Sequence, residues 1–293
     1  MPTPGRGVGV TGLRIVTHKT WLADLFRPLG AVQDYGFDID PKTALDTYWW
    51  APGAWVASAY KAGVELPLLS CGPRWLDDLP MEYKGREVST GWLGDWGPFF
   101  ERETLMCERY PEVFVKLPEA KVDSFPARTH GTKYMRSNLA QYNLPDSTLV
   151  QIQGVMDFVT EARFFIAHGQ ITASSIYRHR EWIWGGDNPP LPPLIGNKMR
   201  KMERFANLVL NDPAVTYPPG FVLDIGITDA GNPKVIEANA AWSSGPYDAD
   251  PRGVLEAIKA SHDFSGEHAE WLWRNHANPV WAHVGALKVV RSA

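Results

Sequence analysis

The chain has 293 residues, of which 44% are hydrophobic and 21% are charged, with a formal net charge of −4. This composition supplies a buried core and excludes an intrinsically disordered chain, which has few apolar residues and a large net charge. It also argues against binding to nucleic acid by phosphate neutralisation, because that mode of binding needs a basic excess.

The sequence contains no long apolar run, so we expect no membrane span, and the N-terminus lacks the apolar block of a signal peptide. Two cysteines, Cys71 and Cys107, are too few for a disulfide framework or a cysteine-rich zinc site. These features predict a cytoplasmic protein with no membrane partner and no nucleic-acid partner.

The first hundred residues predict a smaller N-terminal α/β domain. Residues 1–12 are rich in glycine and proline and predict a flexible lead-in. Leu13–Thr17 is rich in strand-forming residues, and Trp21–Leu29 is typical of a helix. Residues 30–100 contain several breakers and no chemical motif, so we place a domain boundary at residue 100.

From residue 101 the pattern sharpens into strands and helices, which predicts an α+β fold. The predicted strands are Val113–Lys116, Leu149–Gln153, Arg163–Ala167, Gln170–Tyr177, Phe221–Ile227 and Pro233–Ala238. The predicted helices are Glu101–Tyr110, Lys133–Tyr142, Gly196–Leu210, Val254–His262 and Glu267–His276. A two-residue turn at His168 and Gly169 predicts a hairpin in which Arg163 pairs near Ser174.

Two of these strands each carry an acid inside an apolar run. A turn at Ala230–Gly231 places Asp224 opposite Glu237, and Asn239 shares the face of Glu237 because strand side chains alternate. Two adjacent carboxylates repel each other, and a hard divalent cation removes that conflict. An oxygen-only ligand set suits Mg²⁺, so the pattern favours a magnesium site. The alternative is a pair of acids that face solvent or hold a nearby arginine.

This spacing resembles the magnesium signature of the ATP-grasp ligases. Glu237 follows Asp224 by 13 residues and Asn239 follows Glu237 by two. Arg163 and Arg178, together with Lys116, resemble the clade of this superfamily that is marked by two arginines and a lysine. The resemblance covers residues 113–250. It implies an ATP-grasp domain over residues 101–293, in which two α+β subdomains grip ATP.

The resemblance also assigns residues to the nucleotide, namely Lys116, Lys121, Gln151, Ile152, Gln153, Val155, Glu161, Arg163 and Arg178. The lysines and arginines would neutralise phosphate, backbone groups of residues 151–153 would bond the adenine edge, Val155 would pack on its face, and Glu161 would bind ribose. The alternatives are ordinary surface lysines and a plain core strand at residues 149–155. The loop after Lys116 lacks the long glycine-rich run of many ATP-grasp enzymes, and Arg128 and His130 are further candidates for phosphate contact.

The implied activity is ATP-dependent ligation of a small-molecule or peptide carboxylate to an amine, with ATP and Mg²⁺ as cofactors. The carboxylate attacks the γ-phosphate to give an acyl phosphate, and the amine then displaces phosphate. Lys116, Arg163 and Arg178 would act in catalysis. The candidates for substrate binding are Arg180, Trp182, Ser243 and Ser244, with His179 and Trp184 beside them. Two other classes stay open: a phosphotransferase on the same fold, and a non-catalytic nucleotide-binding or structural protein.

Overall fold

A computed structural model describes residues 12–94, 109–122, 125–186, 191, 195–275 and 277–291, without the side chains of residues 134, 136 and 275. The predicted lead-in, the boundary at residue 100, Cys107 and nearly all of the helix predicted at Glu101–Tyr110 lie outside these residues. Within this part of the chain, no helix has the length and apolar character needed to cross a membrane.

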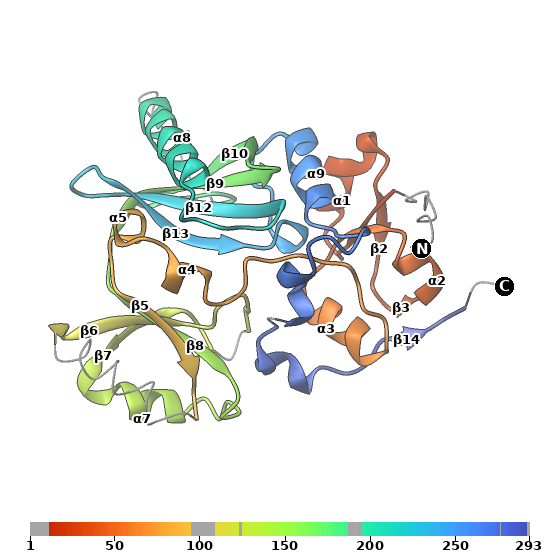
Figure 1. The fold of residues 1–293 in the computed structure, drawn as a ribbon, viewed down its shortest axis with the longest axis horizontal. Helices are drawn as coiled ribbons and strands as arrows, with labels where there is room; N and C mark the ends of the chain where they lie inside the picture. The colour runs from red at the N-terminus through yellow and green to blue at the C-terminus, as the bar shows by residue number, and fades with distance from the viewer. Residues whose placement is uncertain are drawn as a thin grey trace.

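The N-terminal layer is a three-stranded parallel sheet in the order β2–β1–β4, and it confirms the strand predicted at Leu13–Thr17 (Figure 1). Its elements are β1 (Leu13–Val16), α1 (Thr20–Phe26), the 3-10 turn η1 (Arg27–Leu29), β2 (Val32–Asp34), α2 (Pro41–Ala44), β4 (Tyr48–Trp50) and α3 (Gly53–Lys61). The C-terminal strand β14 (Lys288–Val289) pairs with β3 (Asp38–Ile39), so the end of the chain returns to this layer.

A second sheet of four antiparallel strands lies at the lower left of Figure 1, in the order β5–β8–β6–β7. Its strands are β5 (Val88–Trp92), β6 (Glu112–Lys116), β7 (Arg128–Gly131) and β8 (Leu149–Gly154). The short helices α4 (Trp75–Asp78) and α5 (Met81–Lys84) precede it, and η2 (Thr132–Tyr134) and α7 (Met135–Ala140) cover most of the predicted helix at Lys133–Tyr142.

The third sheet has five antiparallel strands in the order β11–β10–β9–β12–β13. Its strands are β9 (Phe158–Ala167), β10 (Gln170–His179), β11 (Trp182–Ile183), β12 (Gly220–Thr228) and β13 (Pro233–Asn239). Two helices pack on it, α8 (Ile195–Asn211) and α9 (Pro251–Ala260). The remaining short 3-10 turns are η3 (Ala241–Ser243), η4 (Ala269–Trp271), η5 (Trp273–Asn275) and η6 (Pro279–His283).

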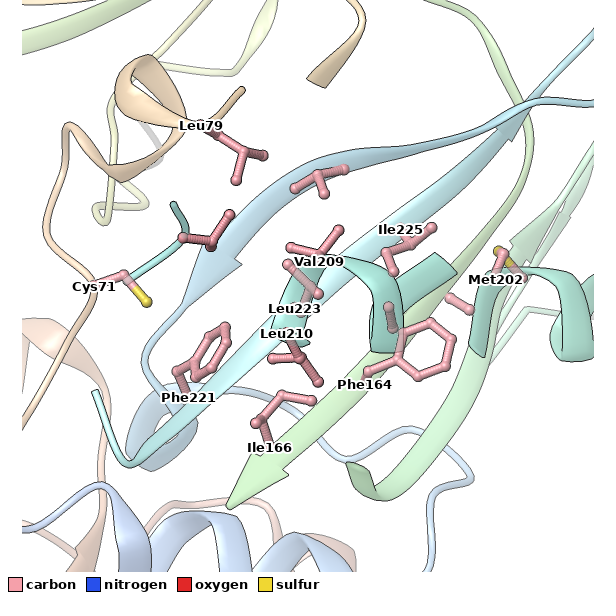
Figure 2. Packing of buried hydrophobic residues seen from close by; sticks show 14 of the residues in the cluster. Cys71, Leu79, Phe164, Ile166, Met202, Val209, Leu210, Phe221, Leu223 and Ile225 are labelled. Carbon is pink, nitrogen blue, oxygen red and sulfur yellow. The ribbon is translucent and has the colours of Figure 1, made fainter. Parts of the chain in front are cut away.

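Strand alternation divides the side chains of this third sheet between two cores. Phe164 and Leu223 are neighbours across β9 and β12 and pack with Met202 of α8 in the cluster of Figure 2. Phe165 and Val222, one residue away along their strands, pack on the opposite face against α9. Continuing along that second face, the next side chains of β9 and β12 are Arg163 and Asp224. The fold therefore carries two charged residues on a face that begins as apolar core.

The hairpin at His168 and Gly169 is confirmed, and both residues have positive φ values of 50° and 74°. Its predicted register is wrong by one residue, because a bulge between Ile171 and Ala173 pairs Arg163 with Ser175 instead of Ser174.

The helix predicted at Glu267–His276 is also wrong within the described residues, which form the short turns η4 and η5. Backbone groups of this segment bond to the chain at residues 68–70 instead: the Ser70 amide donates to the Trp271 carbonyl, and the Trp273 amide donates to the Leu68 carbonyl. Because these groups serve a contact with distant residues, a continuous helix does not form.

Candidate active site

The predicted pairing of Asp224 with Glu237 is confirmed across β12 and β13. The Asn239 amide nitrogen donates to Asp224 Oδ2 at 3.1 Å and to Glu237 Oε1 at 2.8 Å. The two carboxylates and the amide therefore converge on one position, as the strand period predicts.

Asp224 is held by Arg163 through a two-point ion pair. Arg163 Nε and Nη2 donate to the two oxygens of Asp224 at 2.9 and 2.8 Å, and Nη1 donates to the Gly245 carbonyl at 3.2 Å. Both side chains are almost completely buried. Burial opposes the charge of the guanidinium, but the Asp224 carboxylate raises the pKa of Arg163 above its ordinary value. This geometry corrects the prediction that Arg163 clamps phosphate, because its donors orient Asp224.

Two tyrosines enclose the Arg163 guanidinium. Its Cζ lies 4.9 Å from the ring centre of Tyr247 and 5.9 Å from that of Tyr177, and the two rings stack with centroids 5.0 Å apart. Sequence reasoning missed both tyrosines, because Tyr177 lies at a bulge in β10 and Tyr247 lies in a loop. The rings exclude water from the ion pair and strengthen it.

Glu237 is neutralised from the other sheet, where Lys116 at the end of β6 donates to Glu237 Oε2. Burial alone would raise the pKa of Glu237, but Lys116 and the Asn239 amide more than offset it and lower that pKa to about 2. The charge of the exposed Lys121 acts in the same direction. Both predicted lysines therefore lie near the acids.

The argument that two adjacent carboxylates require a divalent cation is corrected by these contacts. Each acid already has its own cation from the protein, Arg163 for Asp224 and Lys116 for Glu237. The donor set still fits Mg²⁺, because a carboxylate oxygen has a second lone pair and a half-turn of the Asn239 amide would present its oxygen. In the described part of the chain, no cluster of three His, Cys, Asp or Glu side chains offers a competing metal site.

A family model described as an ATP-grasp domain, family 2 of its clade, matches residues 84–257, which is more than half of the chain. The chain belongs to this ATP-grasp family. No curated protein matches it.

Solved structures agree with the fold. The ATP-grasp chain aligns with D-cycloserine synthetase DcsG at a TM-score of 0.50 and 14% identity, over 85% of this chain and 98% of that one. A RimK domain protein from Sphaerobacter thermophilus DSM 20745 aligns at a TM-score of 0.47 and 13% identity, also over 85% and 98%. The family match and the first of these alignments identify the fold as an ATP-grasp fold.

In this ATP-grasp domain, Glu161 and Arg178 face each other across β9 and β10 and form an ion pair at 2.5 Å. Arg178 is partly exposed, with 46% of its side chain accessible, whereas Glu161 is mostly covered. The geometry brings this pair onto the same strands as Arg163 and leaves the Arg178 guanidinium with free donors.

The predicted adenine contacts at Gln151, Ile152 and Gln153 are corrected by the sheet. Strand β8 pairs with β5 on one edge and with β6 on the other, so its backbone groups serve the sheet. The glutamine side chains belong to a buried polar chain in which Gln153 donates to Gln151, and Gln151 donates to Thr90. Backbone groups free of this pairing begin at Val155, which is 44% exposed and follows the strand.

Arg86 ties the two sheets together beside this chain. Its guanidinium donates at 2.8 Å to Gln153 Oε1 and to the carbonyls of Val235 and Ile236, the two residues that precede Glu237. Sequence reasoning missed Arg86 because it lies in a segment without a motif.

Most predicted substrate residues lie away from the acids. Arg180 lines a separate hollow beside α8, and Trp182 packs on the apolar cluster under that helix. Ser244 is buried and donates to the Ala240 carbonyl. His179 bonds to Thr160 on the neighbouring strand. These side chains serve packing and local hydrogen bonds, so a substrate role for them finds no contact in the structure.

Trp184 does lie near the site, unlike Trp182, because its ring contacts Tyr247 at a centroid distance of 5.4 Å. Ser243 ends the turn η3 and is half-buried. Arg128 packs over the ring of Tyr142, and His130 is buried on β7 opposite Val113, so neither prediction of phosphate contact gains support.

Glu119, three residues after Lys116, is a further acid that sequence reasoning missed. Its backbone has a φ of 53°, and its carboxylate accepts from the Ser70 hydroxyl and the Gly72 amide, each at 3.2 Å. Desolvation raises the pKa of Glu119 to about 7 against the opposing charge of Lys116. The loop after Lys116 is thereby attached to the segment that leaves the N-terminal layer.

Proposed function

We propose that this ATP-grasp chain is an ATP-dependent carboxylate–amine ligase that acts through an acyl phosphate. One observation carries the proposal: Lys116 of the four-stranded sheet meets Glu237 of the five-stranded sheet, where Asn239 and Asp224 complete the cluster. A cation and a set of hard oxygen ligands on facing sheets form the kind of site that phosphoryl transfer needs. The likeness of the fold to ATP-grasp ligases supports the same assignment.

Asp224, Glu237 and Asn239 would hold Mg²⁺. When bound, the ion would offset the negative charge that develops on the phosphate oxygens of ATP. Arg163 contributes as a positioning residue, because it fixes both oxygens of Asp224 in one orientation. The tyrosines over its guanidinium keep water away from that pair.

Lys116, Lys121 and Arg178 would neutralise the transferred phosphoryl group. Lys116 lies at the boundary between the sheets, Lys121 is exposed beside it, and Arg178 keeps donors that Glu161 does not use. Preorganised cations of this kind stabilise the charge of the transition state more than that of the bound substrate. No protein nucleophile is needed, since the substrate carboxylate attacks the γ-phosphate itself.

The proposed substrates are a small-molecule or peptide carboxylate and an amine acceptor. The wall of the site formed by Tyr177, Tyr247 and Trp184 is aromatic, and the Asp248 carboxylate accepts from the Trp184 indole at 2.7 Å. We propose that this wall, in place of Arg180 and Trp182, contacts the substrate. For the nucleotide, backbone groups that follow β8 at residues 155–157 replace those of residues 151–153 as the proposed adenine contacts.

The first experiment is a screen for ADP release with ATP, Mg²⁺ and mixtures of amino acids and small carboxylates, with products identified by mass spectrometry. Glu237→Gln should lower ADP release at least about 100-fold, because it removes charge from the cluster while retaining its size. Asp229→Asn is the matched control, since Asp229 lies on the exposed turn of the same hairpin and should leave turnover unchanged.

The outcomes separate the classes of function. A ligase releases free phosphate only when an amine is present and forms an amide, whereas a phosphotransferase leaves phosphate on the acceptor. Turnover that survives in Glu237→Gln would contradict the assignment of the acid cluster. A chain that binds ATP but releases no ADP in any mixture would be a non-catalytic nucleotide-binding protein.

A further inference from the structure

A cavity of about 390 Å³ lies behind the segment that connects the N-terminal layer to the four-stranded sheet. Its walls come from segments distant in sequence: the start of α4, the ends of β5 and β8, the loop after α8, and the turn η4. Figure 2 shows Cys71, one of the lining residues, at the margin of the apolar cluster and away from Met202. The cavity therefore opens beside a packed core that can hold its shape.

Aromatic side chains form most of the cavity wall. Trp75, Trp92 and Trp271 line it together with the aliphatic Leu149 and Val215. Trp75 is buried and anchored, because its indole nitrogen donates to the Thr216 carbonyl at 2.8 Å. Flat apolar walls of this kind favour an aromatic ring, which can stack on an indole or meet its edge.

Two opposite charges lie at the same cavity. Arg74 and Asp78 both line it, both are exposed, and they stand four residues apart around α4. Arg74 donates from Nη1 to the Thr90 carbonyl, and the same nitrogen lies 4.0 Å from Asp77, which leaves the donors of Nε and Nη2. Within the residues that the structure describes, the Asp78 carboxylate has no hydrogen bond and no ion pair.

We propose that this cavity binds a free amino acid with an aromatic side chain. The three tryptophans would take the ring, the Arg74 guanidinium would bind the carboxylate, and Asp78 would accept from the ammonium group. A phosphate or nucleotide fits less well, because Asp78 would repel it. A simple amine or a simple carboxylate would satisfy only one of the two charges. The size lies within the usual range for small-molecule sites.

This cavity is separate from the proposed nucleotide site but adjoins it. Cys71 and Gly72 line the cavity, and the Gly72 amide on the same segment donates to Glu119. The Glu119 carboxylate lies within the electrostatic field of Lys116 and Glu237. A ligand in the cavity would thus rest against the segment that holds the loop after Lys116.

Isothermal titration of the full chain with L-phenylalanine, without ATP or Mg²⁺, tests the proposal. We expect saturable binding with one site and a Kd of about 1 mM or tighter. Trp271→Ala should weaken binding at least tenfold by removing one wall. Phe37→Ala is the matched control, because Phe37 is 73% exposed on the N-terminal layer and away from the cavity.

Ligand analogues assign the two charges. Arg74→Met should weaken phenylalanine and 3-phenylpropionate at least tenfold and leave 2-phenylethylamine unchanged. Asp78→Asn should weaken phenylalanine and 2-phenylethylamine and leave 3-phenylpropionate unchanged. Circular dichroism spectra should match that of the parent chain, since both substituted side chains are exposed.

Three results would overturn the inference. The first is the absence of saturable binding at tenfold above the expected Kd. The second is binding that Arg74→Met, Asp78→Asn and Trp271→Ala all leave unchanged. The third is binding lost in Glu237→Gln but kept in the cavity variants, which would place the amino acid at the nucleotide site. Because no turnover is measured, failure here leaves the ligase proposal untouched, and failure of the ligase screen leaves this one untouched.

Discussion

At the scale of single residues, two arginines on the same sheet have opposite surroundings. Arg163 is buried and bonded to both oxygens of Asp224, whereas Arg178 is partly exposed and shares one bond with Glu161. A buried charge that loses its partner is much more costly than an exposed one, because water cannot take the place of the partner.

We therefore expect Arg163→Met to lower the free energy of unfolding by about 3–5 kcal/mol, since it leaves the Asp224 carboxylate buried and unpaired. Arg178→Met should cost less than about 1 kcal/mol. Urea denaturation of both variants measures the difference. The double variant Arg163→Met/Asp224→Leu should be more stable than Arg163→Met alone. Equal costs for the two arginines would contradict the role assigned to Arg163.

At the scale of elements, packing decides features that local patterns leave open. Helix α9 lies so close to β10 that a Cβ atom built on Gly253 would come within 2.0 Å of the Thr172 carbonyl oxygen. Gly196, in the first turn of α8, meets its nearest atom at 3.7 Å, an ordinary contact. Two helical glycines with the same intrinsic propensity thus have different reasons to be there.

Gly253→Ala should lower the free energy of unfolding by about 1–3 kcal/mol, because α9 must move away from the sheet. Helix propensity alone predicts the opposite, a gain of up to about 1 kcal/mol. Gly196→Ala is the control and should follow propensity, with a small gain. Thermal denaturation of both variants decides between the two effects, and a stabilised Gly253→Ala protein would show that the close approach is not rigid.

At the scale of the whole molecule, the N-terminal layer is joined to the end of α9 by a buried histidine. The Trp49 amide on β4 donates to His262 Nε2 at 2.9 Å, and Nδ1 of the same ring lies 2.8 Å from the Ile258 carbonyl. Both contacts are satisfied by a neutral ring with its hydrogen on Nδ1. Burial lowers the pKa of His262 from its ordinary 6.5 to about 4.

Because the unfolded chain takes up this proton at a higher pH than the folded one, stability is lost as the pH falls through this window. We expect His262 to account for a loss of about 2 kcal/mol between about pH 7 and pH 5. Urea denaturation at both pH values measures the loss, and His262→Gln should remove most of it. His18→Gln, at an exposed position, should keep the full pH dependence. A slope unchanged in His262→Gln would contradict the assignment.

The sequence by itself determined the ATP-grasp fold and the strands of the acid cluster. Strand alternation and turn residues act locally, so they establish that Asp224 faces Glu237 and that Asn239 lies beside them. The resemblance carried by these three residues and the two arginines and lysine then led to the family.

Only the tertiary structure decided what each charged side chain touches. The bulges in β10 moved the partner of Arg163 and placed Tyr177 over its guanidinium, and pairing on both edges removed the backbone of residues 151–153 from the predicted adenine contacts. Arg86 and Glu119 join segments far apart in the chain, and no spacing rule reports such contacts. Their energies depend on burial and on facing charges, which exist only once the sheets are packed together.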